Sequence, residues 1–98
     1  MKLLLSVARE AEAEALEASE WYEKRSQGLG RAFLELVEQT LEELAERPRQ
    51  FPLVYRDVRR ALLKRFPYGV FFRIRREQIR VLAVLHLSRN PQRWQRRR

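Results

Sequence analysis

The chain has 98 residues, of which 45% are hydrophobic, and its formal net charge is +8. This length and composition predict one folded domain over residues 1–98 and exclude a disordered basic tail. The absence of cysteine excludes disulfides and thiolate metal sites. A single histidine argues against a catalytic metal, so we expect no metal and no cofactor. The apolar start, residues 3–5, is too short for a signal peptide or membrane span, which predicts a soluble cytoplasmic protein.

Net positive charge is confined to the second half of the chain. Residues 1–46 carry eleven Glu and five Lys or Arg, whereas residues 47–98 carry sixteen Lys or Arg and two acids. The halves therefore have charges of −6 and +14, which together give the +8 of the whole chain. Segregated charge creates a directional field that attracts a polyanion to one face. The candidate partners are nucleic acid, an acidic protein, or both in turn.

The first half predicts a strand followed by a helical hairpin. Residues 2–5 form a short apolar run, and Ser6 stands where a helix N-cap is expected. Small and aromatic residues then recur every three or four positions, with Leu16 and Trp21 beside them, and predict an amphipathic helix: Ala8, Ala11, Ala15, Ala18 and Tyr22. Residues 26–30 break this helix, and a second is expected over about residues 31–46, ending before Pro48.

The second half predicts strands, because the hydrophobic period changes from 3.6 to 2 at Val58. Strands are expected over residues 58–65, 70–75 and 79–87, the last nearly all apolar and buried on both faces. Asn90-Pro91 is expected to start a short C-terminal helix. The predicted fold is α+β with the order β-α-α-β-β-β, a helical hairpin packed on a mostly antiparallel four-stranded sheet.

Four strings in this order resemble the RelE/ParE superfamily of toxins from bacterial type II toxin–antitoxin pairs, which includes plasmid-stabilisation proteins. They are Trp21-Tyr22-Glu23, Gly28-Leu29-Gly30, RRALLKRFPYGVFFRI over residues 59–74 and VLAVLHLSRNPQRW over residues 81–94. The resemblance covers nearly the whole chain and implies the same β-α-α-β-β-β fold. It also implies a growth-inhibiting protein whose partner is a cognate antitoxin encoded next to it.

The resemblance leaves the target open between two branches of the superfamily. One branch cleaves translated mRNA in the ribosome without a metal, and the other poisons DNA gyrase. Metal-free RNA cleavage needs a base, cations around the phosphate and an acid for the leaving oxygen. If this chain is a nuclease, the resemblance implies catalytic roles for Arg60, Lys64, His86 and Arg89.

Two departures from the nuclease pattern favour the gyrase branch. Gly69 stands where an arginine usually opens the middle strand, and Trp94 stands about where a catalytic tyrosine would be. An indole N–H cannot act as a general acid. Further contacts to nucleic acid or another target are expected from the basic residues of the sheet and the C-terminal segment, together with this tryptophan: Arg73, Arg75, Arg93 and Trp94.

Each candidate residue also has a structural interpretation. His86 would be a half-buried structural histidine, and Arg60 and Lys64 the solvent-facing side of a strand. Arg89 would anchor the C-terminal turn to a helical Glu, and Trp94 would be a packing residue. Trp21 and Tyr22 are expected to close the core at the end of the first helix.

Two other functions stay open at this stage. The chain would bind nucleic acid tightly without chemistry if its +14 half were only a binding module, with affinity falling steeply as salt rises. The other alternative is that the chain is a degenerate, non-toxic family member. If it is a toxin, we expect an acidic antitoxin to lie between the hairpin and the sheet and to mask Arg60, Lys64 and Arg89.

Overall fold

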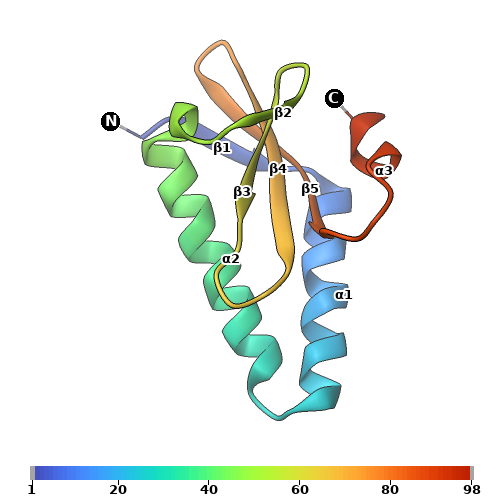
Figure 1. Cartoon of the computed structure of the whole chain (residues 1–98). Coiled ribbons are helices and arrows are strands. Elements are labelled where there is room, and N and C mark those ends of the chain that lie inside the picture. The colour runs from blue at the N-terminus through green and yellow to red at the C-terminus, as the bar shows by residue number, and fades with distance from the viewer. Residues whose placement is uncertain (1, 98) are drawn as a thin grey trace.

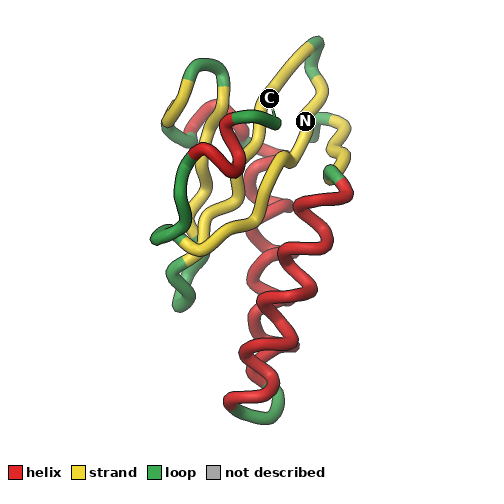
Figure 2. Tube along the Cα trace, turned by 90° about the vertical axis from the view of Figure 1, so that its right-hand side faces the viewer, coloured by secondary structure: helices red, strands yellow, loops and turns green. Residues whose placement is uncertain are grey.

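The computed structural model describes residues 2–97, which form a helical hairpin packed on a five-stranded sheet (Figure 1). The elements are β1 (Leu4–Val7), α1 (Arg9–Arg25), α2 (Leu29–Glu46), the 3-10 turn η1 (Pro48–Gln50), β2 (Leu53–Tyr55), β3 (Val58–Leu62), β4 (Tyr68–Arg75), β5 (Gln78–His86) and α3 (Gln92–Gln95). The predicted α+β class, the helical hairpin and the short C-terminal helix are confirmed. Figure 2 shows the hairpin projecting well beyond one end of the sheet. None of the helices in residues 2–97 is long and apolar enough to cross a bilayer.

The sheet has five strands, so the prediction of four strands is wrong by one edge strand. The missed strand is β2, which spans three residues and pairs irregularly with β3 around Val54. A run this short is too brief for an alternating pattern to be recognised. The strand order is β1-β5-β4-β3-β2, with β1 parallel to β5 and the other pairs antiparallel.

A β-bulge in β5 changes which face of the sheet its later residues occupy. Phe72 pairs with Val81 and Phe71 with Ala83, so Leu82 is an extra residue in the ladder. Val81 and Val84 pack in the core beneath the helices, whereas Leu82 and Ala83 both pack on the opposite face. Because an extra residue breaks the strict alternation of side chains, the rest of β5 is shifted by one position.

Helix α1 begins differently from the prediction, which placed Ser6 at the N-cap. Ser6 lies within β1, and its hydroxyl accepts a hydrogen bond from Arg80 over 3.2 Å. The N-cap is Ala8, whose backbone N–H donates to the Val81 carbonyl over 2.8 Å. The sheet rather than a side chain therefore satisfies this donor at the start of α1.

The turn between the helices is held by one carboxylate. Glu23 accepts hydrogen bonds from the backbone N–H groups of Gly28 and Gly30, over 2.8 and 2.9 Å. Gly28 adopts the left-handed conformation at φ 87°, which favours glycine. A Cβ at Gly30 would lie 2.3 Å from the Ser19 carbonyl oxygen, so the helices approach too closely there for a side chain. Glu23 thus caps α2 from the preceding helix.

These backbone donors give the hairpin a specific pH dependence. The hydrogen bond from Gly28 and then that from Gly30 lower the pKa of the Glu23 carboxyl. A lowered folded-state pKa stabilises the protein above the unfolded-state pKa of about 4.3, and this stabilisation is lost as pH falls through the folded value. We expect Glu23→Gln to lower Tm at pH 7 and to lower it less as the pH falls below 4. A Tm difference that stayed constant from pH 7 to pH 3 would contradict this account.

The core beneath the helices combines small and aromatic side chains. Ala11, Ala15 and Ala18 of α1 are buried as predicted. Four aromatic rings fill the space between the helices and the sheet, those of Tyr22, Phe33, Phe66 and Tyr68. Neighbouring ring centroids lie 4.8–6.1 Å apart. Leu16 and Trp21, expected beside the buried stripe, are 50% and 52% exposed. Tyr22 alone therefore closes the core, and Trp21 faces outward beneath Arg25.

A second, smaller core covers the other face of the sheet. Trp94 of α3 is 6% exposed, and its ring stacks on Phe71 at a centroid distance of 4.4 Å. Val58, Leu82, Ala83 and Leu85 complete this cluster. The sheet is thus enclosed between the α1–α2 hairpin and the C-terminal segment, which explains why β5 is apolar on both faces.

Candidate functional site

A groove with a volume of about 670 Å³ lies between α1 and the end of β5. On one side lie acidic and aromatic residues of α1, including Glu17, Glu20 and Trp21. On the other lie His86, Ser88, Arg89 and Arg93, and Tyr68, Val84 and Leu85 also line it. We call this feature the α1–β5 groove. It combines apolar, aromatic and cationic surface, which suits an amphipathic polypeptide segment.

The α1–β5 groove contains an unpaired length of strand edge. Strand β1 pairs with β5 only as far as Val81, although β5 continues to His86. Glu14 accepts a hydrogen bond from the Val84 N–H over 3.1 Å, and Arg97 donates to the Leu82 carbonyl over 3.2 Å. Charged side chains therefore occupy part of an edge that would otherwise accept another strand.

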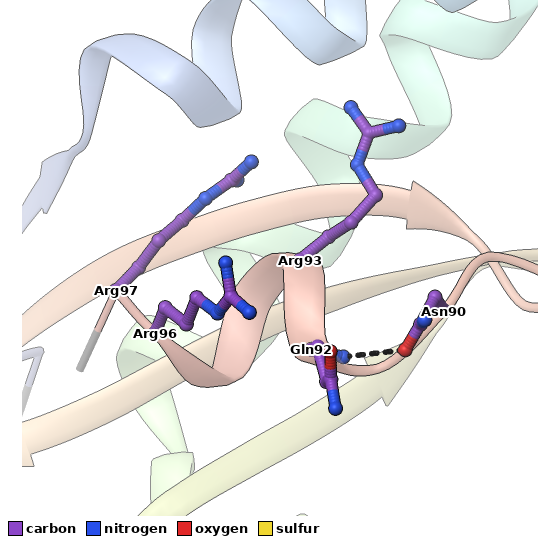
Figure 3. A pocket seen from close by; sticks show the side chains of 5 residues that line it. All are labelled: Asn90, Gln92, Arg93, Arg96 and Arg97. Carbon is purple, nitrogen blue, oxygen red and sulfur yellow. Dashed lines mark hydrogen bonds between the residues drawn. The ribbon is translucent and has the colours of Figure 1, made fainter.

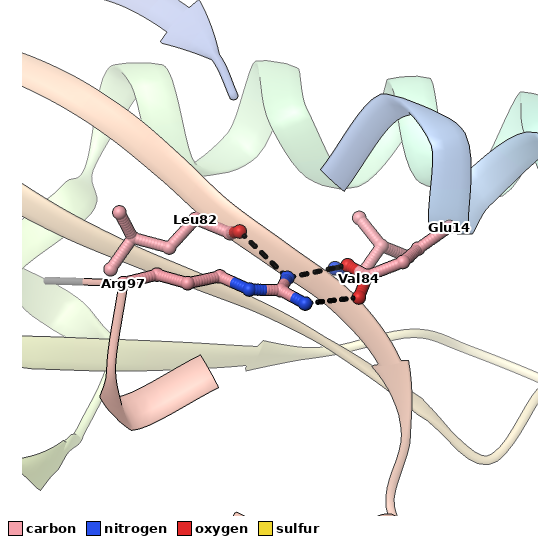
Figure 4. A network of polar contacts seen from close by, with 4 residues as sticks. All are labelled: Glu14, Leu82, Val84 and Arg97. Carbon is pink, nitrogen blue, oxygen red and sulfur yellow. Dashed lines mark hydrogen bonds and ion pairs between the residues drawn. The ribbon is translucent and has the colours of Figure 1, made fainter. Parts of the chain in front are cut away.

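Glu14 and Arg97 also bind each other, as Figure 4 shows. The guanidinium contacts the carboxylate at 2.8 and 2.9 Å, and the side chains are 12% and 20% exposed for Glu14 and Arg97. This two-point ion pair joins α1 to the residue that follows α3 by two positions. The sequence suggested such an anchor for Arg89, but Arg97 makes it instead.

His86 faces the α1–β5 groove with one nitrogen already engaged. Its Nδ1 accepts the Ser88 backbone N–H over 3.0 Å and lies 2.8 Å from the Ser88 hydroxyl. A backbone N–H can only donate, so a neutral His86 carries its proton on Nε2. In that state Nε2–H is a hydrogen-bond donor and cannot take a proton from a ribose hydroxyl.

Tyr68 forms an aromatic wall beside His86. The two ring centroids lie 5.3 Å apart in an edge-on arrangement. Burial, followed by the nearby Tyr22, raises the pKa of the Tyr68 hydroxyl. Tyr68 therefore remains a neutral phenol near neutral pH, able to donate or accept a hydrogen bond.

Arg60 and His86 lie on opposite faces of the sheet. The Arg60 side chain covers Gly69, where an added Cβ would lie 3.1 Å from the Arg60 Cγ and 3.3 Å from Leu87. Gly69 thus provides the space that Arg60 occupies, and an arginine at position 69 would compete for it. Lys64 follows the end of β3 and is exposed, so it does not lie on the strand with Arg60 as predicted.

The bulge at Leu82 explains why two of the candidate catalytic residues, His86 and Arg60, lie on different faces of the sheet. Without the extra residue, alternation from Val81 would place His86 on the face that Arg60 occupies. With it, His86 and Arg89 line the α1–β5 groove, whereas Arg60 lies across the sheet. His86 and Arg89 could therefore reach one substrate, but Arg60 could not join them, so the full predicted catalytic set is not assembled on one face.

The residues predicted to contact the target, like the catalytic candidates, do not lie together on one surface. Arg93 lines the α1–β5 groove and also a hollow of about 270 Å³ on α3, and it extends from the same side of α3 as Arg97 (Figure 3). Arg75 pairs with Asp57 at 3.3 Å near the end of β4, and Arg73 lies two residues earlier on the same strand. Trp94 is a packing residue, as its structural interpretation predicted, and its ring is buried.

Four contributors to this region were missed by the sequence analysis. Glu14 and Arg97 lie 83 residues apart, and nothing local connects them. Trp21 was assigned to the core, and Tyr68 falls between the strands expected over residues 58–65 and 70–75, although it begins β4. The spacing of Glu14 from Ala11, Ala15 and Ala18 does place it at the edge of the buried stripe, which was the one available signal.

Comparison with known proteins identifies the class to which this fold belongs. The family model described as "ParE toxin of type II toxin-antitoxin system, parDE" matches residues 5–91. The chain belongs to this family. A solved structure titled "Chromosomal ParDE TA system from P. aeruginosa" is similar at a TM-score of 0.73 and 19% identity, covering 89% of this chain and 98% of that one. A comparison with curated proteins finds no significant match.

Proposed function

We propose that this chain is a growth-inhibiting toxin that a cognate antitoxin holds inactive, and that its target is DNA gyrase. Membership of the ParE family over residues 5–91 supports the toxin and the antitoxin. The choice of gyrase rests on one observation. Of the groups that the nuclease branch would use, His86 and Arg89 share the α1–β5 groove, whereas Arg60 lies on the opposite face of the sheet.

The antitoxin is proposed to occupy the α1–β5 groove. An amphipathic segment there would place apolar side chains against Trp21 and Tyr68, and acidic ones beside Arg89 and Arg93. Arg89 is the one residue of the predicted masking set that lines this groove. To cover Arg60 as well, the antitoxin would have to pass around the end of the sheet.

Poisoning of gyrase requires binding rather than acid–base chemistry by the toxin itself. His86 offers a donor where a nuclease needs a base, and the buried Trp94 occupies the position expected for a catalytic acid. Neither feature prevents the chain from contacting a protein target. Binding to gyrase therefore does not require His86 or any other group of the α1–β5 groove to act as a general acid or base.

The proposal is tested by expressing the chain alone from a tightly repressed promoter. We expect growth arrest with intact mRNA and with cleaved or abnormally supercoiled plasmid DNA, and restored growth when the antitoxin is co-expressed. Arrest with mRNA cut at translated codons would replace gyrase by the ribosome as the target. Normal growth despite soluble protein would contradict the toxin assignment.

A further inference from the structure

The end of the sheet farthest from the α1–α2 turn gathers cations from separate parts of the sequence. The turn between β2 and β3, the turn between β4 and β5, and η1 all lie at this end (Figure 1). A hollow of about 430 Å³ opens between them. Its charged lining consists of Arg49, Arg56, Arg59 and Arg76, with Asp57 and Glu77. We call these residues the tip cluster.

The two acids of the tip cluster already have partners. Asp57 pairs with Arg75 at 3.3 Å, and Glu77 pairs with Arg49 at 3.0 Å. Arg56 and Arg76 form no ion pair within residues 2–97. No carboxylate among these residues neutralises either arginine, although the Arg56 guanidinium lies over the Tyr55 ring at 5.3 Å. Both positive charges can therefore attract an anion at the surface.

Arg59 is held in place by hydrogen bonds, although no ion pair within the described part of the chain neutralises its charge. Its guanidinium donates to the backbone carbonyls of Phe51 and Arg49, over 2.6 and 3.2 Å. These bonds use one terminal nitrogen and restrict the side chain. A restrained guanidinium loses less conformational entropy when it binds a phosphate than a freely moving one.

The backbone at the two turns provides a separate indication. Arg56 and Arg76 have φ values of 50° and 53°, in the left-handed region that favours glycine and asparagine. Both arginines line the same hollow at positions where their backbone conformation is disfavoured, and Glu77, which follows Arg76, has a φ of 59° as well. Tight hairpin turns require a positive φ, and glycine or asparagine would adopt it more readily, so the backbone does not explain why arginine stands at these positions.

We propose that the tip cluster binds the phosphodiester backbone of nucleic acid. Guanidinium groups match phosphate geometry and bind it through paired hydrogen bonds. The apolar part of the lining is supplied by Leu53 and Ile74, which is little for the core of a protein interface. The tip cluster is distinct from the α1–β5 groove, so a bound antitoxin in the groove leaves it accessible.

The test compares the full wild-type chain with a variant that lacks two positive charges of the tip cluster. The replacing residue is chosen to suit the left-handed backbone conformation of the two turns. In Arg56→Asn/Arg76→Asn, asparagine suits the left-handed conformation, so Tm should equal or exceed that of the wild type. The matched control, Arg25→Gln/Arg31→Gln, removes the same charge at the α1–α2 turn. Binding is measured by fluorescence anisotropy with a labelled 20-base-pair DNA duplex and a labelled 20-nucleotide RNA, each across a range of salt concentrations.

We expect the tip variant to bind duplex DNA at least tenfold more weakly than the control variant. The slope of log K against log salt should fall by about 1.8, since each lost phosphate contact accounts for about 0.9. Equal slopes in the two variants would overturn the proposal. It would also be overturned if neither nucleic acid bound while labelled polyglutamate bound in a tip-dependent manner, because the partner would then be an acidic protein. Growth arrest plays no part in this readout, so its result is independent of the proposed toxicity.

Discussion

Replacing Trp94 with Ala is expected to lower the free energy of unfolding by about 3–5 kcal/mol. The indole stacks on Phe71, contacts Tyr55 edge-on at 5.8 Å and covers the second core. Its removal leaves apolar surface exposed across the middle of the sheet, and the remaining cavity cannot be refilled by a helix of four residues. Urea denaturation followed by circular dichroism measures the change.

The control for this substitution is Arg96→Ala, which truncates an exposed side chain two residues later on the same segment. A surface substitution of this kind is expected to change stability by no more than about 0.5 kcal/mol. A Trp94→Ala protein as stable as the control would show that α3 is not part of the folded core.

Reversing two charges in the α1–β5 groove is expected to weaken antitoxin binding about 100-fold. Arg89→Glu/Arg93→Glu would place like charges against an acidic segment, and 100-fold corresponds to about 2.7 kcal/mol, or about 1.4 kcal/mol for each residue. Both side chains are exposed, so the substitutions should leave the fold intact. Isothermal titration calorimetry with the cognate antitoxin gives the affinity.

The matched control is Lys2→Glu/Arg47→Glu, which changes the net charge equally at exposed positions outside the α1–β5 groove. Its affinity should stay within a few-fold of the wild type, because long-range attraction is screened beyond about 10 Å at 0.1 M salt. If both double variants lost affinity equally, the antitoxin would be responding to overall charge, and the groove would not be its site.

Periodicity predicted most of the fold because the elements are long and their burial is regular. The alanine stripe of α1 and the alternation in β4 each repeat over several turns or residues, so their patterns are clear. The start of α1 was misplaced because its first donor is satisfied by Val81, which is distant in sequence. Tertiary contacts of this kind leave no local pattern.

The candidate site was harder to predict because it depends on which face of a strand each residue occupies. A single extra residue at Leu82 transfers His86 from one face of the sheet to the other. Hydrophobic residues on both sides of the bulge conceal it, since β5 is buried on both faces and alternation is absent. The pairing of Glu14 with Arg97 required the complete fold.

The most direct test of the proposed function is a supercoiling assay with purified DNA gyrase, relaxed plasmid, ATP and the purified chain. We predict that the chain will inhibit supercoiling and cause cleaved plasmid to accumulate on gyrase, and that added antitoxin will reverse both effects. Unimpaired supercoiling, together with mRNA cleavage on translating ribosomes, would contradict the gyrase assignment and identify the ribosome as the target.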